Sequence, residues 1–475
     1  MYSTVTDSSH LKKLLAVIAL AIFIDSLDGS IVNIALPTIA EGFSVDMSTA
    51  AWVIMAYFLF LVGLIPLFGK IADHGRLQEI FCWGFVVFTV GSVACGLAPD
   101  LLMLVVSRAA QGVGASMIAV AAPLLVVRLM PKRHWGMGMG MAATAGAVAL
   151  VFGPVLGGIL TEYLSWHWCF FINVPVGIVA VILGLRIIPK AERQPKIRFD
   201  LAGAVLIFTA MASLIYLLER GIPLGWMHPQ VIFCGGVFAV SVVIFVVREL
   251  RVADPILRVR VFGSLPFTFV VSSYFLISVV YAGFLYIIPF YMSIVLGMSP
   301  AVSGLILLIS SVITAVMGLP SGALSDRIGA RWLVTGAGVV RVLFCLVMAV
   351  MMPESGLFWI LLLMVLSGLT FGISGGPSSA RIIEHAPEGE GGTGSVVMML
   401  SQYSGMVVGV ALYALVFNLA VPGAADVAVG LLQMEQFLPG FHMTGVFGAV
   451  CSAVVVILSV VVKDRIAGKN IEKCM

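Results

Sequence analysis

Apolar runs of roughly 20 residues recur along the whole chain, separated by short clusters of glycine, proline and charged residues. An α-helix needs about 20 apolar residues to cross the hydrocarbon core of a bilayer. Breaking the chain at these clusters predicts fourteen membrane-spanning helices, at residues 13–36, 48–69, 78–98, 100–127, 135–161, 168–189, 200–219, 229–248, 266–292, 300–322, 331–351, 356–380, 393–420 and 440–462. The connections are too short for a soluble domain, so we expect an all-α integral membrane protein.

The distribution of basic residues orients these helices. Cytoplasmic loops of membrane proteins carry an excess of Lys and Arg. If the chain begins inside, Arg220 is the one residue of the 26 Lys and Arg that falls in an outer loop, and Arg108 and Arg341 fall within spans. All the others lie in inner loops or tails. This pattern predicts a multi-pass protein of the prokaryotic cytoplasmic membrane with both termini in the cytoplasm.

An internal repeat divides the chain. GKIADHGR at 69–76 closes the second predicted helix, GALSDRIGAR at 322–331 closes the tenth, and Asp73 aligns with Asp326. The repeat predicts two six-helix pseudo-repeats with two extra helices between them. The expected units are an N-terminal bundle (1–190), the inserted helices with an inner-surface linker (191–263), and a C-terminal bundle (264–475). Repeats of this kind place a binding site between the halves near the bilayer midplane.

Composition narrows the classes of function. The chain is 61% hydrophobic and 10% charged, with a formal net charge of +3 and no basic patch of the kind that binds nucleic acid. Its cysteines are scattered singly, and no HExxH, GxSxG or Walker pattern occurs. We therefore expect no enzyme, no metal site and no cofactor. A channel is not expected either, because it would have no use for the duplicated loops.

Three charged residues lie deep within the predicted helices of the first half. Asp25 and Asp28 stand halfway along the first helix, three residues apart and so on one face. Arg108 lies about eight residues into the fourth. Charges at this depth need partners, and the acids are the obvious partners of the arginine. Removal from water favours the protonated form of a carboxyl group, as proton exchange requires. The alternatives are structural acids and a static ion pair.

Four local patterns carry a family resemblance: LDGSIVNIALP at 27–37, the paired Asp loops, RAAQGVGAS at 108–116 and GPVLGG at 153–158. Together they resemble the major facilitator superfamily, in particular its fourteen-helix drug:proton antiporter branch. The resemblance implies a secondary transporter that works by alternating access and acts as a monomer. Its partners would be the lipid bilayer, a small-molecule substrate and protons, with the proton gradient as the driving force.

The resemblance also implies roles for individual residues. Proton coupling is expected at Asp28, which matches the family's helix-1 acid, together with Arg108 and with Asp25, which is outside the usual pattern. Gating is expected from the glycine-rich helix and from the two loops, at Gly153, Pro154, Gly157, Gly158, Asp73, Arg76, Asp326, Arg327 and Arg331. The first loop has Arg76 where the family usually has Gly, and Gln78 where it has a basic residue. The second loop is intact.

Substrate contacts are expected from both halves. The candidates are polar or aromatic residues within spans: Asp25, Asn33, Gln111, Tyr281, Tyr286, Gln402, Tyr403 and Arg341. Two placements of Arg341 are open, lining the cavity or reaching the inner surface. The leading hypothesis is export of lipophilic or cationic small molecules in exchange for protons. The alternative is a transporter of a polar metabolite such as an organic acid or sugar, since Arg108 and Arg341 would suit an anion.

Overall fold

The computed structural model describes residues 8–131, 134–190, 200–252, 255, 257–352, 356–387, 391–423 and 427–464. Helices account for nearly all of them, and these described residues contain no β-strand. In chain order the α-helices are α1 (Ser8–Gly42), α2 (Met47–Ile71), α3 (Leu77–Gly96), α4 (Leu101–Leu129), α5 (Trp135–Tyr163), α6 (Trp168–Phe171), α7 (Asn173–Ile187), α8 (Leu201–Arg220), α9 (Pro229–Arg251), α10 (Leu265–Phe290), α11 (Pro300–Ile328), α12 (Ala330–Val350), α13 (Gly356–His385), α14 (Gly391–Ala420) and α15 (Met434–Val461). Short π-helical turns at Ala72–Arg76 and Tyr291–Val295 and 3-10 turns at Val259–Gly263 and Val429–Leu431 join some of them.

Fourteen helical segments of the described chain are long and apolar enough to cross a membrane, which confirms the predicted number and fold class. Helices α6 and α7 together form one span, Trp168–Ile187. The largest differences from the predicted boundaries are six residues: α1 and α11 end six residues later than expected, and α15 begins at Met434, six residues earlier. Gln433 and Gln436 form a capping box that starts the helix there, and the chain stays helical through Pro439, where the sequence pattern placed a break.

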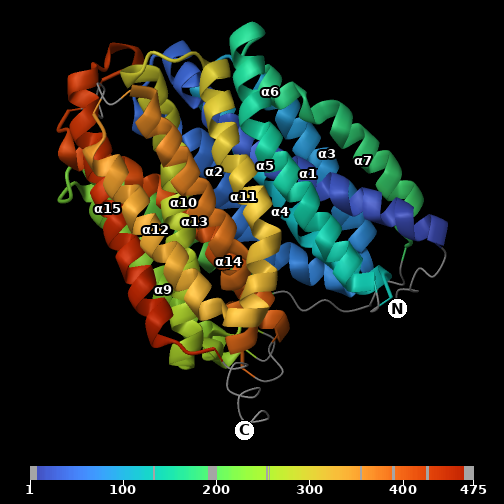
Figure 1. The fold of residues 1–475 in the computed structure, drawn as a ribbon. Helices are drawn as coiled ribbons and strands as arrows, with labels where there is room; N and C mark the ends of the chain where they lie inside the picture. The colour runs from blue at the N-terminus through green and yellow to red at the C-terminus, as the bar shows by residue number, and fades with distance from the viewer. Residues whose placement is uncertain are drawn as a thin grey trace.

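The helices form two groups that meet along α5 and α11 (Figure 1). Helices α3 and α7 lie on the right of this view, and α12 and α15 on the left. Within the first group α1 packs against α5, and α3 against α4. Within the second α10 packs against α14, and α12 against α15. The inserted helix α8 contacts α2 and α14, one helix from each group.

The inserted helices α8 and α9 pack against each other and are tied together at one end. Asp200 caps α8 through the backbone N–H of Gly203, and its Oδ1 lies 2.8 Å from Arg248 of α9. Partial burial raises the pKa of Asp200, but the hydrogen bonds from Gly203 and Arg248 outweigh it and hold that pKa below its usual value. Because the folded-state pKa is depressed, this contribution to stability is present at neutral pH and is lost only as the pH falls through that lowered pKa.

One end of the bundle is closed between the two halves. We call the end that holds residues 43–46, 296–299, 421–423 and 427–433 the closed end. There Asn418 Nδ2 donates to Ser48 Oγ at 2.7 Å, and Tyr286 donates to the carbonyl of Met47 at 2.9 Å. The backbone N–H of Ala301 donates to Glu162 at 2.8 Å. Each of these hydrogen bonds joins the first half to the second.

Helices α5 and α11 separate away from the closed end. Near that end Gly158 faces the carbonyl of Pro300, and Gly304 faces the carbonyl of Pro154, so the two backbones touch. About four turns away from the contact of Pro154 with Gly304, along each of the two helices, lie Gly140 and Gly318. A Cβ added at either glycine would meet no atom within 4 Å. The halves therefore diverge from the closed end toward the opposite end.

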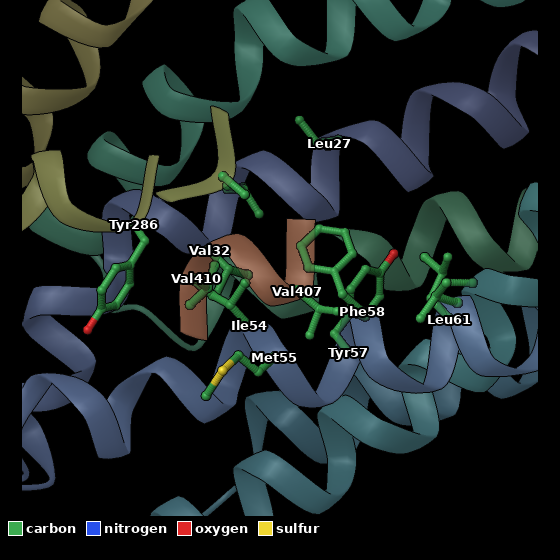
Figure 2. Packing of buried hydrophobic residues seen from close by; sticks show 14 of the residues in the cluster. Leu27, Val32, Ile54, Met55, Tyr57, Phe58, Leu61, Tyr286, Val407 and Val410 are labelled. Atoms are coloured by element: carbon green, nitrogen blue, oxygen red, sulfur yellow. The ribbon is translucent and has the colours of Figure 1, made fainter. Parts of the chain in front are cut away.

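Apolar packing between α2 and α14 also joins the two halves. Figure 2 shows Val407 and Val410 of α14 beside Ile54 and Phe58 of α2. These side chains are 6% exposed or less. Large apolar residues elsewhere, such as Phe233, are more than half exposed, as expected for side chains that face lipid.

Candidate functional site

An ion pair lies buried inside the first half. Arg108 of α4 lies 2.6 Å from Asp28 Oδ2 of α1, and the two side chains are 1% and 0% exposed. Gln111 donates to Asp28 Oδ1 at 2.7 Å and accepts a hydrogen bond from Arg108 at 2.7 Å. Arg108 Nε donates to the carbonyl of Val53 at 3.0 Å, and its guanidinium stacks over Tyr57 at 4.2 Å from the ring centroid. The charged group expected to partner Arg108 is thus Asp28.

The glycines that follow Arg108 in the sequence bring α4 close to its neighbours. A Cβ at Gly112 would collide with the carbonyl of Tyr57 in α2, and one at Gly114 with the backbone of Phe88 in α3. Gly91 of α3 faces the backbone of Gln111 in the same way. This close packing of backbones lets a short donor such as Gln111 reach α1.

Asp25 occupies a different environment from Asp28. Its carboxylate accepts hydrogen bonds from the hydroxyls of Tyr57 and Tyr403, both at 3.3 Å. Tyr403 belongs to α14, so this contact joins the two halves. Phe58 lies beside Tyr403, with ring centroids 6.3 Å apart. Asp25 is half-buried rather than sealed, and none of its hydrogen bonds in the described residues comes from a cation.

Sequence reasoning missed three residues of this cluster. Asn173, at the start of α7, donates to Asp28 Oδ1 at 2.7 Å. Ser92 accepts from Gln111 at 2.9 Å, and Tyr57 contacts both Arg108 and Asp25. The available signal was a lone polar residue within an apolar run, which is a weak signal because neutral polar residues in membrane helices also bond to their own backbone.

A cavity lies between α5 of the first half and α10, α11 and α13 of the second. It is lined by Leu150, Pro154, Tyr281, Phe284, Leu285, Leu307, Ser310, Ser311, Thr314 and Phe371. Most of this surface is apolar, and the hydroxyls come from α10 and α11. Tyr281, predicted as a substrate contact, packs edge-on against Phe371 with ring centroids 4.5 Å apart.

Other predicted contact residues lie apart from this cavity. Asn33 donates to the carbonyl of Gly29 in its own helix at 2.8 Å. Tyr286 is 1% exposed, and its hydroxyl is used at the closed end. Gln111 belongs to the buried ion pair. Gln402 is half-buried next to Tyr403 in α14.

Arg341 takes neither of the two placements that the sequence left open. Its side chain is 0% exposed, so it does not reach a surface, and it is not among the residues that line the cavity. It lies inside the second half, where NH2 donates to Ser374 Oγ at 2.7 Å. The burial of Arg341 excludes one of the two open placements, the inner surface, because α12 turns this face toward α13.

The GPVLGG segment of α5 contacts helices on two sides. Gly153 and Gly157 face Ser30 and Ile31 of α1, where any Cβ would collide. Gly158, with Pro154 one turn earlier, faces α11 of the other half. The segment therefore holds α5 against its own bundle and against the second one at the closed end.

We predict that Gly158→Val opens the closed end. The added Cβ would meet the carbonyl of Pro300, so α5 and α11 would have to separate. Spin labels at Tyr163 and Val302, which are 72% and 45% exposed, would report this as a longer distance in pulsed EPR. Gly140→Val is the matched control because its Cβ meets nothing within 4 Å. An unchanged distance in Gly158→Val would contradict the contact.

The predicted gating loops are described only in part, because the side chains of Asp73 and Asp326 lie outside the described residues. Arg327 is exposed. Arg331 bonds within its own half: its backbone N–H donates to Asp464 at 2.9 Å, and its guanidinium donates to the carbonyl of Val460. Among the described residues, these hydrogen-bond partners of Arg331 thus lie in the second half.

Part of the first loop, Ala72–Arg76, forms a π-helical turn. Gly75 within it has φ of +86°, a conformation that favours glycine. Gln78, buried in α3, donates to the carbonyls of Gly184 and Leu185 at the end of α7. Gln78 therefore has a packing role within the first half.

Residues 18–410 match the family model described as the Major Facilitator Superfamily. The chain is 29% identical over 411 residues to a protein named riboflavin transporter RibZ, from Clostridioides difficile, with 85% of this chain and 87% of the relative covered. It is 29% identical to the multidrug resistance protein Stp of Mycobacterium tuberculosis, with 84% of this chain and 75% of that relative covered. It is 30% identical to the putative multidrug resistance protein MdtD of Escherichia coli, covering 69% and 70%.

Solved structures share the fold. A bacterial homologue of the human lysosomal transporter Spinster, described as inward-facing and unoccupied, superposes with a TM-score of 0.68 at 14% identity, covering 96% of this chain and 98% of the other. The human organic anion transporter MFSD10 superposes with a TM-score of 0.61 at 14% identity, covering 95% and 99%. At this identity the likeness concerns the fold alone.

Proposed function

This chain belongs to the major facilitator superfamily, and from that premise we propose that it exports lipophilic cations from the cytoplasm in exchange for protons. The transporter class follows from the family. The proton and the cation are supported by two acids in one helix with different surroundings. Asp28 is fully enclosed with Arg108, whereas Asp25 lies half-buried between the halves among aromatic rings.

The orientation that we propose rests on the basic residues. Arg220 is the one Lys or Arg in the predicted outer loops, and it lies at the closed end, at the last residue of α8. The closed end is then the outer end, and both termini, with the linker at 190–199, face the cytoplasm. The conformation described here is accordingly inward-facing, with the α5–α11 contact as the outer seal. Alternating access requires that this contact break in the outward-facing state.

The proposed coupling site is the ion pair of Asp28 with Arg108. In the inward-facing state Asp28 accepts hydrogen bonds from a guanidinium and two amides. In the outward-facing state a proton on Asp28 would replace Arg108 as its partner. Return to the inward-facing state would restore the ion pair and release the proton to the cytoplasm. The loop residues Asp73, Arg76, Asp326, Arg327 and Arg331 are proposed to pair across the halves only in the outward-facing state.

The proposed substrate site lies next to Asp25. Its carboxylate is half-buried at the boundary between the halves, with Tyr57, Phe58 and Tyr403 around it. Carboxylates and aromatic faces both attract organic cations. Tyr281 and Gln402 are proposed to add contacts from the second half. We propose a monomer as the functional unit, since each half supplies part of the site.

Transport in proteoliposomes tests this function. We expect a lipophilic cationic dye to move against its own gradient when a pH gradient is imposed, and the movement to stop when a protonophore collapses that gradient. Liposomes without protein are the control. Dye movement that ignores the pH gradient would contradict proton coupling.

Transport of a polar or planar metabolite is the second candidate. Its support is the 29% identical relative named a riboflavin transporter, together with the buried Arg341. Riboflavin and an aromatic carboxylate belong in the same panel as the dye. Saturable transport of either, with no movement of the dye, would favour this candidate.

A further inference from the structure

Arg341 is a buried cation that lacks a carboxylate partner among the described residues. The guanidinium is 0% exposed and lies between α12 and α13. NH2 donates to Ser374 Oγ at 2.7 Å and, more weakly, to the carbonyl of Thr370 at 3.4 Å. Nε and NH1 have no acceptor within the described chain. One face of the guanidinium lies over the ring of Phe371, 5.1 Å from its centroid.

The first half shows what is missing from this arrangement. There the buried Arg108 has a carbonyl, an amide oxygen and an aromatic face as well as the carboxylate of Asp28. Arg341 has a carbonyl, a hydroxyl oxygen and an aromatic face as its counterparts, but no carboxylate among the described residues. A guanidinium stays protonated in proteins. A buried charge without a counter-charge is strongly unfavourable.

We propose that Arg341 is an anion-binding site in the second half, which takes one small monovalent anion or one carboxylate oxygen at an unpaired N–H of its guanidinium, on Nε or on Nη1. Each of these two N–H groups carries part of the positive charge, so either can donate a charge-assisted hydrogen bond to a carboxylate oxygen or a halide. The hydroxyl of Ser374 fixes the guanidinium from the other side. The anion supplies the negative charge that Asp28 supplies in the first half.

Phe371 places this site next to the cavity between the two halves. Its ring covers Arg341 and also lines the cavity between the halves, where it packs against Tyr281. A rotation of this one ring would connect the guanidinium with the cavity. The anion can therefore come from two sources: chloride from solution, or the acidic group of a transported molecule.

Thermal unfolding of the purified protein in detergent tests the site without relying on transport. The buffer is changed from sodium chloride to the sodium salt of a bulky sulfonate, MES, at equal ionic strength. We expect chloride to raise the unfolding midpoint in proportion to the logarithm of its concentration above the dissociation constant, by about 3 °C at roughly 100 times that constant. Sodium benzoate is the second arm. The variants are Arg341→Gln and, as a control of equal chemistry on the surface, Arg260→Gln.

The outcomes separate the two sources. Arg341→Gln is expected to abolish the anion response and to unfold at a higher temperature than the wild type in MES, because the uncompensated charge is gone; Arg260→Gln is expected to behave as the wild type. A larger shift with benzoate, reduced by Phe371→Trp, assigns the site to an organic carboxylate. A response to chloride alone assigns it to the halide. An equal response in Arg341→Gln, or no response to either anion in the wild type, overturns the proposal.

Discussion

Asp28→Asn is expected to abolish transport driven by a pH gradient, because it removes the proposed proton site while preserving the side-chain volume. Uptake of dye into proteoliposomes should fall to the level of empty liposomes at every pH. Exchange of labelled for unlabelled dye, which needs no proton, should persist. Gradient-driven accumulation with an unchanged pH dependence would move the proton site elsewhere.

Loss of Asp28 also leaves a guanidinium buried without its carboxylate, which typically costs about 3–5 kcal/mol of stability. Thermal stability and expression therefore have to be measured alongside transport. The double variant Asp28→Asn, Arg108→Gln is the control, since it removes both charges from the same enclosed site. We expect it to recover most of the lost stability and none of the gradient-driven transport. Recovery of transport would show that the ion pair has a structural role only.

The fold could be predicted from the sequence because one physical requirement dominates it. Each span must supply about 20 apolar residues, and the loops must carry the charges. The length of a helix beyond the membrane was harder to predict. Helix α13 continues to His385, past the predicted end at residue 380. In this added segment Arg381 lies 3.2 Å from Asp464, which follows α15. Partners so distant in the sequence give no local signal.

The site could be predicted only where charge demanded a partner. Asp28 and Arg108 were expected to meet because neither could remain alone in an apolar helix. Asn173 carries no charge, so nothing in its own segment pointed to Asp28. Tyr286 was a reasonable candidate for substrate, but its hydroxyl serves the closed end. Aromatic residues in a span give no indication of which face of the helix they occupy.

Asp25→Asn is expected to weaken binding of a lipophilic cation about 30-fold or more, because it removes the negative charge that would face the cation in a partly desolvated site. Binding of a neutral molecule of similar size should change little. Fluorescence titration of detergent-solubilised protein at fixed pH measures both affinities without a gradient, so the result does not depend on proton coupling.

Tyr403→Phe is the matched control for this change. It removes the hydroxyl that α14 donates to Asp25 but keeps the carboxylate and the aromatic ring. Cation affinity should therefore fall much less than in Asp25→Asn. Equal affinity for the cation in wild type and Asp25→Asn would show that the carboxylate does not contact substrate. The hydrogen bonds from Tyr57 and Tyr403 would then serve only to hold α1 against α2 and α14.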